Sequence, residues 1–393
     1  MYKLKEVQKT ETPEKEEKTH VLFKVEKGVN LPTVVFFSGI HGNEKAGVVA
    51  LQHIQKTVES LHLKGNVYGV LGNLKALESN QRYIDEDLNR LWTEERLNQI
   101  LSKTNVNVEE KQAQALFVLL HQIINKHNGP LYFIDLHTTS SKTLPFVTIN
   151  DAMINREFSK QFPVPIVLGI EEYLEGPLLS YINTLGFVSI GFESGHHMGI
   201  ASVQNNIAFI NLALVYTGVL EENQVDVMTF RETLKIASEH IHNFFEIIHL
   251  QKISKTDDFK MNDGFKSFQP IEKGTLVARL NTTEILSEHE GYMFMPLYQK
   301  KGNEGYFVIR YVPRFILRAS KHLRRFKADT ILTLLPGVSW SNKSKGVLRV
   351  NLKIAKYFTK PIFHVLGYRS RQVSPTHLFL YNRERVAKTK LYK

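Results

Sequence analysis

Cysteine is absent from the whole sequence, and this absence narrows the chemistry that the chain can support. Without cysteine there is no disulfide and no thiolate metal site, so a metal ion would be held by histidine and carboxylate side chains. Long apolar runs are absent too, since no stretch approaches the roughly 18 to 20 residues that a membrane-spanning helix requires. The first residues lead into lysine- and glutamate-rich sequence with no apolar stretch of signal-peptide type. We therefore expect a cytoplasmic protein.

Acidic residues are scarce in the last part of the chain. Residues 311–393 contain 19 lysines and arginines but only two acids, Asp329 and Glu384, so this segment carries +17 and the rest of the chain −6. Such asymmetry predicts an acidic partner, either another molecule, a membrane surface or an acidic face of this protein itself. The segment contains no named nucleic-acid-binding motif, so we do not expect nucleic acid as its partner. Its apolar stretches indicate that it folds; they cover residues 331–335, 347–352 and 376–381.

The pattern of apolar residues predicts the fold class. With 393 residues, 42% of them hydrophobic, the chain needs more than one unit, because single cores seldom grow beyond about 250 to 300 residues. Apolar runs alternate with stretches of helical spacing, which predicts an α/β fold with a mostly parallel sheet wrapped by helices. We expect strands near residues 21–23, 34–37, 67–71, 131–134, 146–149 and 188–190. We expect packing helices over residues 108–126 and 230–250.

Changes in composition divide the chain into four expected segments. Residues 1–19 form a polar N-terminal lead, and residues 20–250 form the main α/β domain. Residues 251–312 are expected to form a small β domain, because glycines punctuate short apolar runs there. Residues 313–393 form the basic C-terminal extension.

The first candidate metal ligands follow the apolar run 33–37. His41 and Glu44 lie three residues apart in a glycine-containing turn before a helical pattern. At the carboxyl end of a buried strand, both side chains can face one ion in the crevice where open α/β sheets bind ligands. Taken alone the pair is more typical of a surface turn, because His-x-x-Glu occurs by chance.

A second strand end supplies another candidate ligand. The run that begins at Leu131 ends in Asp135 and His137, which alternation places on the same side of a strand. With His41 and Glu44, His137 completes a set of two histidines and one carboxylate, which leaves a coordination position open. Asp135 is then placed to accept a hydrogen bond from a ligand or from a nearby cation. If the other ligands were absent, the pattern would be explained by a histidine at a strand end whose hydrogen bonds are made within the protein.

Two further stretches carry charged side chains that core packing does not explain. In the segment that begins at Arg82, Asn89 and Arg90 combine an amide with a guanidinium fork, which suits bidentate recognition of a carboxylate. A solvated, charge-rich segment is the alternative, above all for its acids. Farther on, a strand delivers Glu193 into a glycine-rich turn, where it is suited to act as a general base. The adjacent His196 and His197 are either exposed loop residues or substrate contacts.

These motifs together resemble the succinylglutamate desuccinylase and aspartoacylase family, relatives of the zinc carboxypeptidases. His41-Gly-Asn-Glu44, the segment from Arg82 to Arg90, Asp135-Leu-His137-Thr and Glu193-Ser-Gly occur in the family's order and approximate spacing. The resemblance implies a zinc carboxypeptidase-like fold over roughly residues 20–310.

The resemblance also implies a role for each residue. His41, Glu44 and His137 would bind one zinc ion per chain, Glu193 would be the general base and Arg82 would polarise the scissile carbonyl. Asn89 and Arg90 would hold a substrate carboxylate, while Asp135 and Asp87 would support these groups from behind. The implied activity is zinc-dependent hydrolysis of the amide bond of an N-acyl amino acid or a similar small carboxylate-bearing amide.

One position departs from the family pattern. The family tends to place an arginine about ten residues before the base glutamate to grip an acidic acyl group, and this chain has Asn183 there. This departure predicts a substrate other than acetyl-aspartate or succinyl-glutamate. A metallocarboxypeptidase acting on peptide ends would use the same atoms and remains an alternative. A polyanion- or surface-binding protein that keeps an idle hydrolase fold is an alternative of another class.

Overall fold

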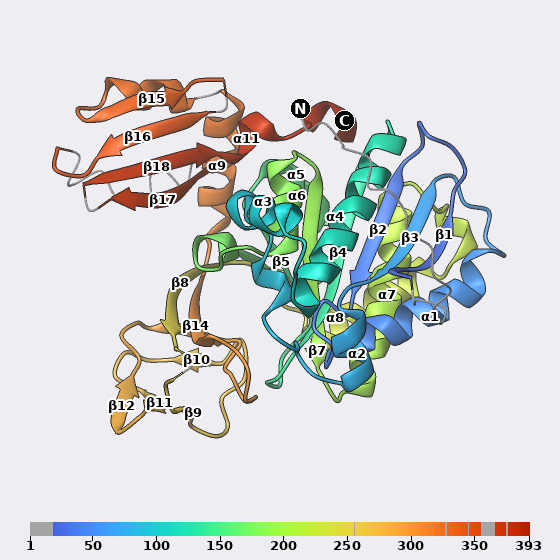
Figure 1. Ribbon diagram of the computed structural model, residues 1–393, viewed down its shortest axis with the longest axis horizontal. Coiled ribbons are helices and arrows are strands. Elements are labelled where there is room, and N and C mark those ends of the chain that lie inside the picture. The colour runs from blue at the N-terminus through green and yellow to red at the C-terminus, as the bar shows by residue number, and fades with distance from the viewer. Residues whose placement is uncertain (1–18, 255, 327, 345, 355–365, 375) are drawn as a thin grey trace.

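A central sheet organises the molecule in the computed structural model, which describes residues 19–393 apart from 255, 327, 345, 355–365 and 375 (Figure 1). The predicted polar lead, residues 1–19, lies outside the described residues except for Thr19. The sheet has eleven strands. Their order is β1 (Val21–Val25), β3 (Asn66–Leu71), β2 (Thr33–Ser38), β4 (Leu131–Thr139), β7 (Val188–His196), β5 (Phe146–Ile149), β6 (Ile166–Leu168), β8 (Phe244–Lys252), β14 (Glu304–Tyr311), β13 (Gly291–Phe294) and β10 (Pro270–Ile271).

Helices cover both faces of this sheet, as the alternation of apolar runs predicts. Every residue of β2 is buried: Val34 and Phe36 pack on one face, and Val35 and Phe37 on the other. The first face packs against α1 (Ala46–Val58), α5 (Met153–Ser159), α7 (Ile200–Tyr216) and α8 (Val227–Ala237). The second packs against α3 (Glu94–Ser102), α4 (Val108–Lys126) and α6 (Leu178–Thr184). A strand buried on both sides needs apolar residues at every position, which explains the unbroken run in β2.

The described residues also contain several short helical elements. They are α2 (Leu74–Ser79), α11 (Arg383–Val386), and the 3-10 turns η1 (Leu88–Arg90), η2 (Ile170–Glu172), η3 (Glu222–Gln224), η4 (Ala328–Leu334) and η5 (Thr389–Tyr392). Among the described residues, no helix combines the length and the apolar character that crossing a membrane requires.

The predicted helix over residues 230–250 is wrong in its second half. Helix α8 ends at Ala237, and residues 244–252 form β8, which pairs with β6 and β14. Glu239 and His240 adopt positive φ angles of 50° and 59°, which end the helix. The aromatic and β-branched residues that follow suit a strand, and their apolar positions had mimicked helical spacing. The helix expected over residues 108–126 is confirmed as α4.

Residues 259–311 contain the short strands expected from their glycines, divided between two sheets. Strands β9 (Phe259–Met261), β11 (Leu276–Leu280) and β12 (Thr283–Leu286) form a separate antiparallel sheet. Strands β10, β13 and β14 instead extend the central sheet beyond β8. This region lies at the lower left of Figure 1.

The basic extension forms its own four-stranded sheet, at the upper left of Figure 1. Helix α9 (Arg314–Arg325) leads into it, and its order is β15 (Val338–Asn342), β16 (Val347–Asn351), β18 (His377–Asn382) and β17 (Tyr368–Ser374). Leu348, Tyr368 and Leu380 are buried in its small core. The apolar stretches predicted to fold correspond to η4, β16 and β18.

Buried arginines join the extension to the main body. Arg324, whose side chain is 1% exposed, lies 2.7 Å from the Asp151 carboxylate and 2.9 Å from Glu384. Arg383 lies 2.7 Å from the carboxylate of Glu171. Burial alone would raise the pKa of Asp151, but Arg156 and Arg324 outweigh it and hold that pKa well below its usual range. Some of the positive charge of the extension is therefore neutralised by acids of the same chain.

We expect Arg324→Ala to lower the free energy of unfolding by about 3 to 5 kcal/mol, because it removes a buried guanidinium that pairs with two carboxylates, those of Asp151 and Glu384. The neighbouring Arg325 is exposed, so Arg325→Ala is the matched control and should change the free energy by less than about 0.5 kcal/mol. Denaturant unfolding of the two variants measures the difference. Equal effects would show that the ion pairs of Arg324 do not anchor the extension.

Candidate metal and active site

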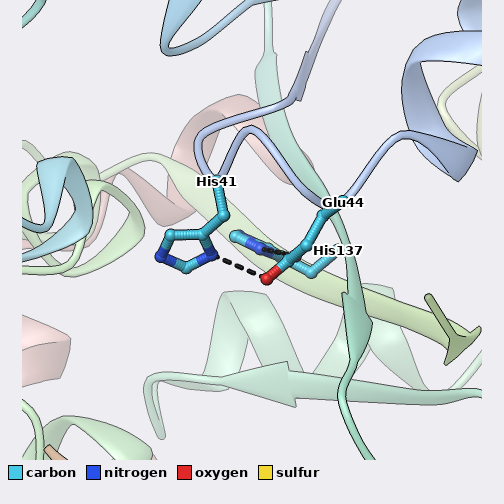
Figure 2. Close-up of side chains that lie close together, drawn as sticks. All are labelled: His41, Glu44 and His137. Atoms are coloured by element: carbon cyan, nitrogen blue, oxygen red, sulfur yellow. Dashed lines mark hydrogen bonds and ion pairs between the residues drawn. The ribbon is translucent and has the colours of Figure 1, made fainter. Parts of the chain in front are cut away.

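Two strand ends bring His41, Glu44 and His137 together. Strands β2 and β4 run parallel and side by side, so the turn after β2 lies next to the end of β4. Within that turn Gly42 passes so close to α2 that an added Cβ would lie 2.0 Å from the backbone carbon of Ala76. The three residues are 4%, 3% and 8% exposed, respectively, and their side chains point toward one another (Figure 2).

The arrangement of these three side chains fits a divalent metal ion. One donor atom from each lies within 4.8 Å of the others. His41 Nδ1 and His137 Nδ1 each lie 2.8 Å from one of the two oxygens of Glu44. Two imidazole nitrogens and a carboxylate are the donors that zinc takes in catalytic sites.

An aspartate lies beside the Nε2 atom of each histidine, on the side of the ring away from Glu44. Asp87 lies 3.0 Å from His41 Nε2, and Asp135 lies 2.7 Å from His137 Nε2, although outside the direction of a hydrogen bond. Burial lowers the pKa of His137, but Asp135 and Glu44 outweigh it and raise that pKa well above its usual value. The carboxylates of Asp87, Asp135 and Glu44 favour a positive charge at the cluster, carried either by a proton or by a metal ion. Carboxylates beside the second ring nitrogen also orient metal-bound histidines.

Glu193 lies beside this cluster. It is the direct neighbour of His137 across the parallel pair β4–β7. The side chain is 8% exposed, and its Oε2 atom has no hydrogen-bond partner among the described residues. Burial raises the pKa of Glu193 to about 7. A carboxyl group of this kind can both accept and release a proton near neutral pH.

The segment from Arg82 to Arg90 borders the same cavity. The Arg82 guanidinium lies 3.3 Å from Glu44 and 3.2 Å from Asp87. Asn89 Oδ1 accepts a hydrogen bond of 2.9 Å from the Leu178 backbone, which leaves its amide NH₂ group for other contacts. The cavity brings together most of the predicted site residues: His41, Glu44, Arg82, Asn89, Arg90, His137, Glu193 and His197.

Other predicted residues lie outside the lining of the cavity. Asp87 and Asp135 stand behind the histidines, as described above, and His196 is not part of the lining. Asn183, at the position where the family tends to have an arginine, is buried in α6 and does not line the cavity either. Its place in the structure therefore does not show where that arginine would meet the substrate. Leu179 and Ser180, from the first turn of α6, line the cavity instead.

Further cavity residues that the motifs did not reveal come from the β region after residue 290. Met295, Leu297, Gln299 and Phe307 line the cavity, and so does Glu304. The Glu304 carboxylate lies 2.9 Å from the Arg90 guanidinium. More than 200 positions separate these two residues in the chain, so no local pattern could predict their contact.

Residues 30–211 match the catalytic domain of the succinylglutamate desuccinylase/aspartoacylase family. Over these residues the chain is similar to that family. Relatives share part of this region. A probable aspartoacylase of Acaryochloris marina is 32% identical over 39% of this chain and 52% of its own length. Aspartoacylase of Rattus norvegicus is 28% identical over 58% of this chain and 71% of its own length.

A relative of a second kind is named for other acyl amino acids. An N-acyl-aromatic-L-amino acid amidohydrolase of Xenopus tropicalis is 36% identical over 28% of this chain and 34% of its own length. The relatives of the chain are thus hydrolases of amide bonds, although the chain spans only about half the length of the first of them.

Solved structures show the same fold. The succinylglutamate desuccinylase/aspartoacylase of Rhodobacter sphaeroides superimposes with a TM-score of 0.55 at 16% identity, over 74% of this chain and 88% of that one. The ectoine utilization protein of Ruegeria pomeroyi gives 0.54 at 18% identity, over 73% and 87%. The predicted mixed α/β fold with a mostly parallel sheet is therefore confirmed.

Proposed function

We propose that this protein hydrolyses the amide bond of an N-acyl amino acid, or of a similar small carboxylate-bearing amide, with zinc held by His41, Glu44 and His137. The observation that carries the proposal is the position of Glu193, which lies beside this three-residue cluster with a raised pKa and an unpaired oxygen. The family of residues 30–211 supports the same reaction class. Zinc would supply a Lewis acid that polarises the amide carbonyl and makes water more acidic.

The other side chains of the cavity have separate roles in catalysis and substrate binding. Glu193 takes a proton from the attacking water and returns it to the nitrogen of the departing amine. Arg82 donates hydrogen bonds to the carbonyl oxygen as negative charge develops there, in a site from which much of the water is excluded. Asn89 offers its free NH₂ group, and Arg90 its guanidinium, to the carboxylate of the amine half.

Glu304 sets a condition on substrate binding. Its carboxylate pairs with Arg90 at 2.9 Å, which is the contact proposed for the substrate carboxylate. Because both groups carry negative charge, the substrate must displace Glu304 from Arg90 or share the guanidinium with it. Glu304 thus occupies the carboxylate position until substrate binds.

A substrate panel tests the proposal. Zinc-loaded protein is incubated with acyl amino acids that differ in acyl group and amine, beside di- and tripeptides, and the products are identified by mass. The proposal expects a free amino acid and a carboxylic acid from the acyl series. Cleavage of peptides alone would favour a carboxypeptidase. Binding of polyanions without turnover of either series would favour a polyanion-binding protein whose hydrolase fold is inactive.

We expect acyl groups without charge to be preferred over succinyl and other acidic ones. Among the described residues that line the cavity, Arg82 and Arg90 are the only arginines and lysine is absent. The wall that α6 and the end of β5 with the residue after it contribute is neutral, with Thr148, Ile149, Asn150, Leu179 and Ser180. A second carboxylate there would be buried without a partner, at a cost of several kcal/mol. Specificity constants for a neutral and an acidic acyl series on one amino acid measure it, and preference for the acidic series would contradict it.

A further inference from the structure

A second group of metal-ligand side chains lies in the β region, outside the candidate active site. His249 comes from β8, while Glu288 and His289 belong to the turn between β12 and β13. One donor atom from each lies within 4.8 Å of the others, and the two imidazole rings are 5.2 Å apart. None of the three lines the cavity that contains His41 and Glu193. Any ion held here would therefore be separate from the proposed catalytic one.

The side chain of His249 packs against β14, and one of its ring nitrogens lacks a hydrogen bond among the described residues. Its strand pairs with β14, where Val308 is its direct partner, and its ring lies 5.8 Å from the ring of the buried Tyr306. His249 Nε2 is buried and has no hydrogen-bond partner among the described residues. Buried polar atoms without a partner are rare in folded proteins, because each costs free energy. A metal ion is a partner that would remove this cost.

The turn that carries the other two residues is fixed by hydrogen bonds. Ser287 is buried, and its hydroxyl donates to the His289 carbonyl at 2.7 Å. The Ser287 backbone exchanges two further bonds with the turn before β11, because its N–H donates to Thr275 O and its carbonyl accepts from Gly274 N, each at 2.8 Å. The backbone on both sides of the cluster is thus set without the ion, as a preformed site requires.

The charge state of the cluster also suits a metal. Glu288 is exposed and contributes the negative charge of its carboxylate. Two imidazoles and one carboxylate form a donor set that zinc accepts, with the remaining positions open to water.

We propose that His249, Glu288 and His289 bind a second divalent transition-metal ion, for which zinc is the best match to the donors. The ion would tie β8 of the central sheet to the turn after β12. This turn leads from β12 of the three-stranded sheet to β13 of the central sheet. Its partly exposed ligands predict weaker binding than at the buried cluster of His41, Glu44 and His137.

Zinc titration of the full-length, metal-free protein tests this proposal. Calorimetry together with metal analysis should find two zinc equivalents per chain in the wild type and one in His289→Ala. His41→Ala should also bind one, and the double variant His41→Ala/His289→Ala should bind none. Glu288→Gln, which keeps the shape of this exposed side chain, should weaken the second equivalent at least about tenfold, since loss of a charged ligand group costs more than a neutral contact.

A matched control uses His53, an exposed histidine of α1, whose replacement by alanine should leave two equivalents in place. A single equivalent in the wild type that disappears in His41→Ala would overturn the proposal. Two equivalents in His289→Ala would overturn it as well, because the second ion would then lie elsewhere. An equivalent lost in His289→Ala but not in His41→Ala would support this site while contradicting the proposed catalytic one.

Discussion

His41→Ala is expected to lose one zinc equivalent relative to the wild type and, with it, measurable amide hydrolysis. His41 supplies one of the three donors, and it also connects Glu44 to Asp87 through hydrogen bonds of 2.8 Å and 3.0 Å. Without the ion the reaction loses the Lewis acid, which is worth several kcal/mol of transition-state stabilisation, and about 1.4 kcal/mol corresponds to a factor of ten in rate. Metal analysis of the purified variant, together with an assay on the best acyl amino acid, measures both losses.

His196→Ala is the matched control for this experiment. His196 ends β7, close in sequence to Glu193, but it does not line the cavity. The control should keep the zinc content of the wild type and most of its turnover. If His41→Ala keeps the same zinc content as His196→Ala, the assignment of His41 as a ligand is wrong.

Glu193→Gln separates proton transfer from metal binding. The amide keeps the size of the carboxyl group but cannot accept a proton, so zinc content should stay at the level of the wild type. Turnover should fall by about 10²- to 10⁴-fold, the usual contribution of a general base, because the same group serves both the water and the departing amine. Steady-state kinetics on protein of known zinc content measures the fall.

Glu304→Gln is the control for Glu193→Gln, because it removes another acid from the same cavity. Glu304 pairs with Arg90 and has no part in the proposed proton transfers. Its replacement should change KM more than kcat, since it frees the guanidinium for the substrate carboxylate. Near-normal turnover of the zinc-loaded Glu193→Gln enzyme would remove Glu193 from the mechanism.

The sequence predicts that His41, Glu44 and His137 lie close together, because strand ends are local features. His41 and Glu44 follow one apolar run and His137 ends another, so a parallel sheet alone brings them near one another. The neighbouring position of Glu193 depends on the same rule, since β4 and β7 are also parallel. In these places the local pattern and the overall topology agree.

The sequence is less informative where contacts join distant segments. Nothing near Glu304 indicates that it pairs with Arg90, because the contact arises only when β14 extends the central sheet past β8. Asn183 was selected by its distance from Glu193 along the chain, but α6 buries it and presents Leu179 and Ser180 to the cavity instead. The predicted helix over residues 230–250 includes most of β8, because apolar spacing alone does not distinguish a short strand from a helix. The positive φ angles of Glu239 and His240, which separate α8 from β8, leave no mark in that spacing.

The return of activity as zinc is added back to metal-free protein tests the central claim most directly. Turnover of an acyl amino acid should be absent after chelation and should rise in proportion to added zinc. It should saturate after the first equivalent, because the buried cluster of His41, Glu44 and His137 is expected to bind zinc more tightly than the exposed one. Metal-free protein that hydrolyses the substrate at the rate of the zinc-loaded enzyme would contradict the account.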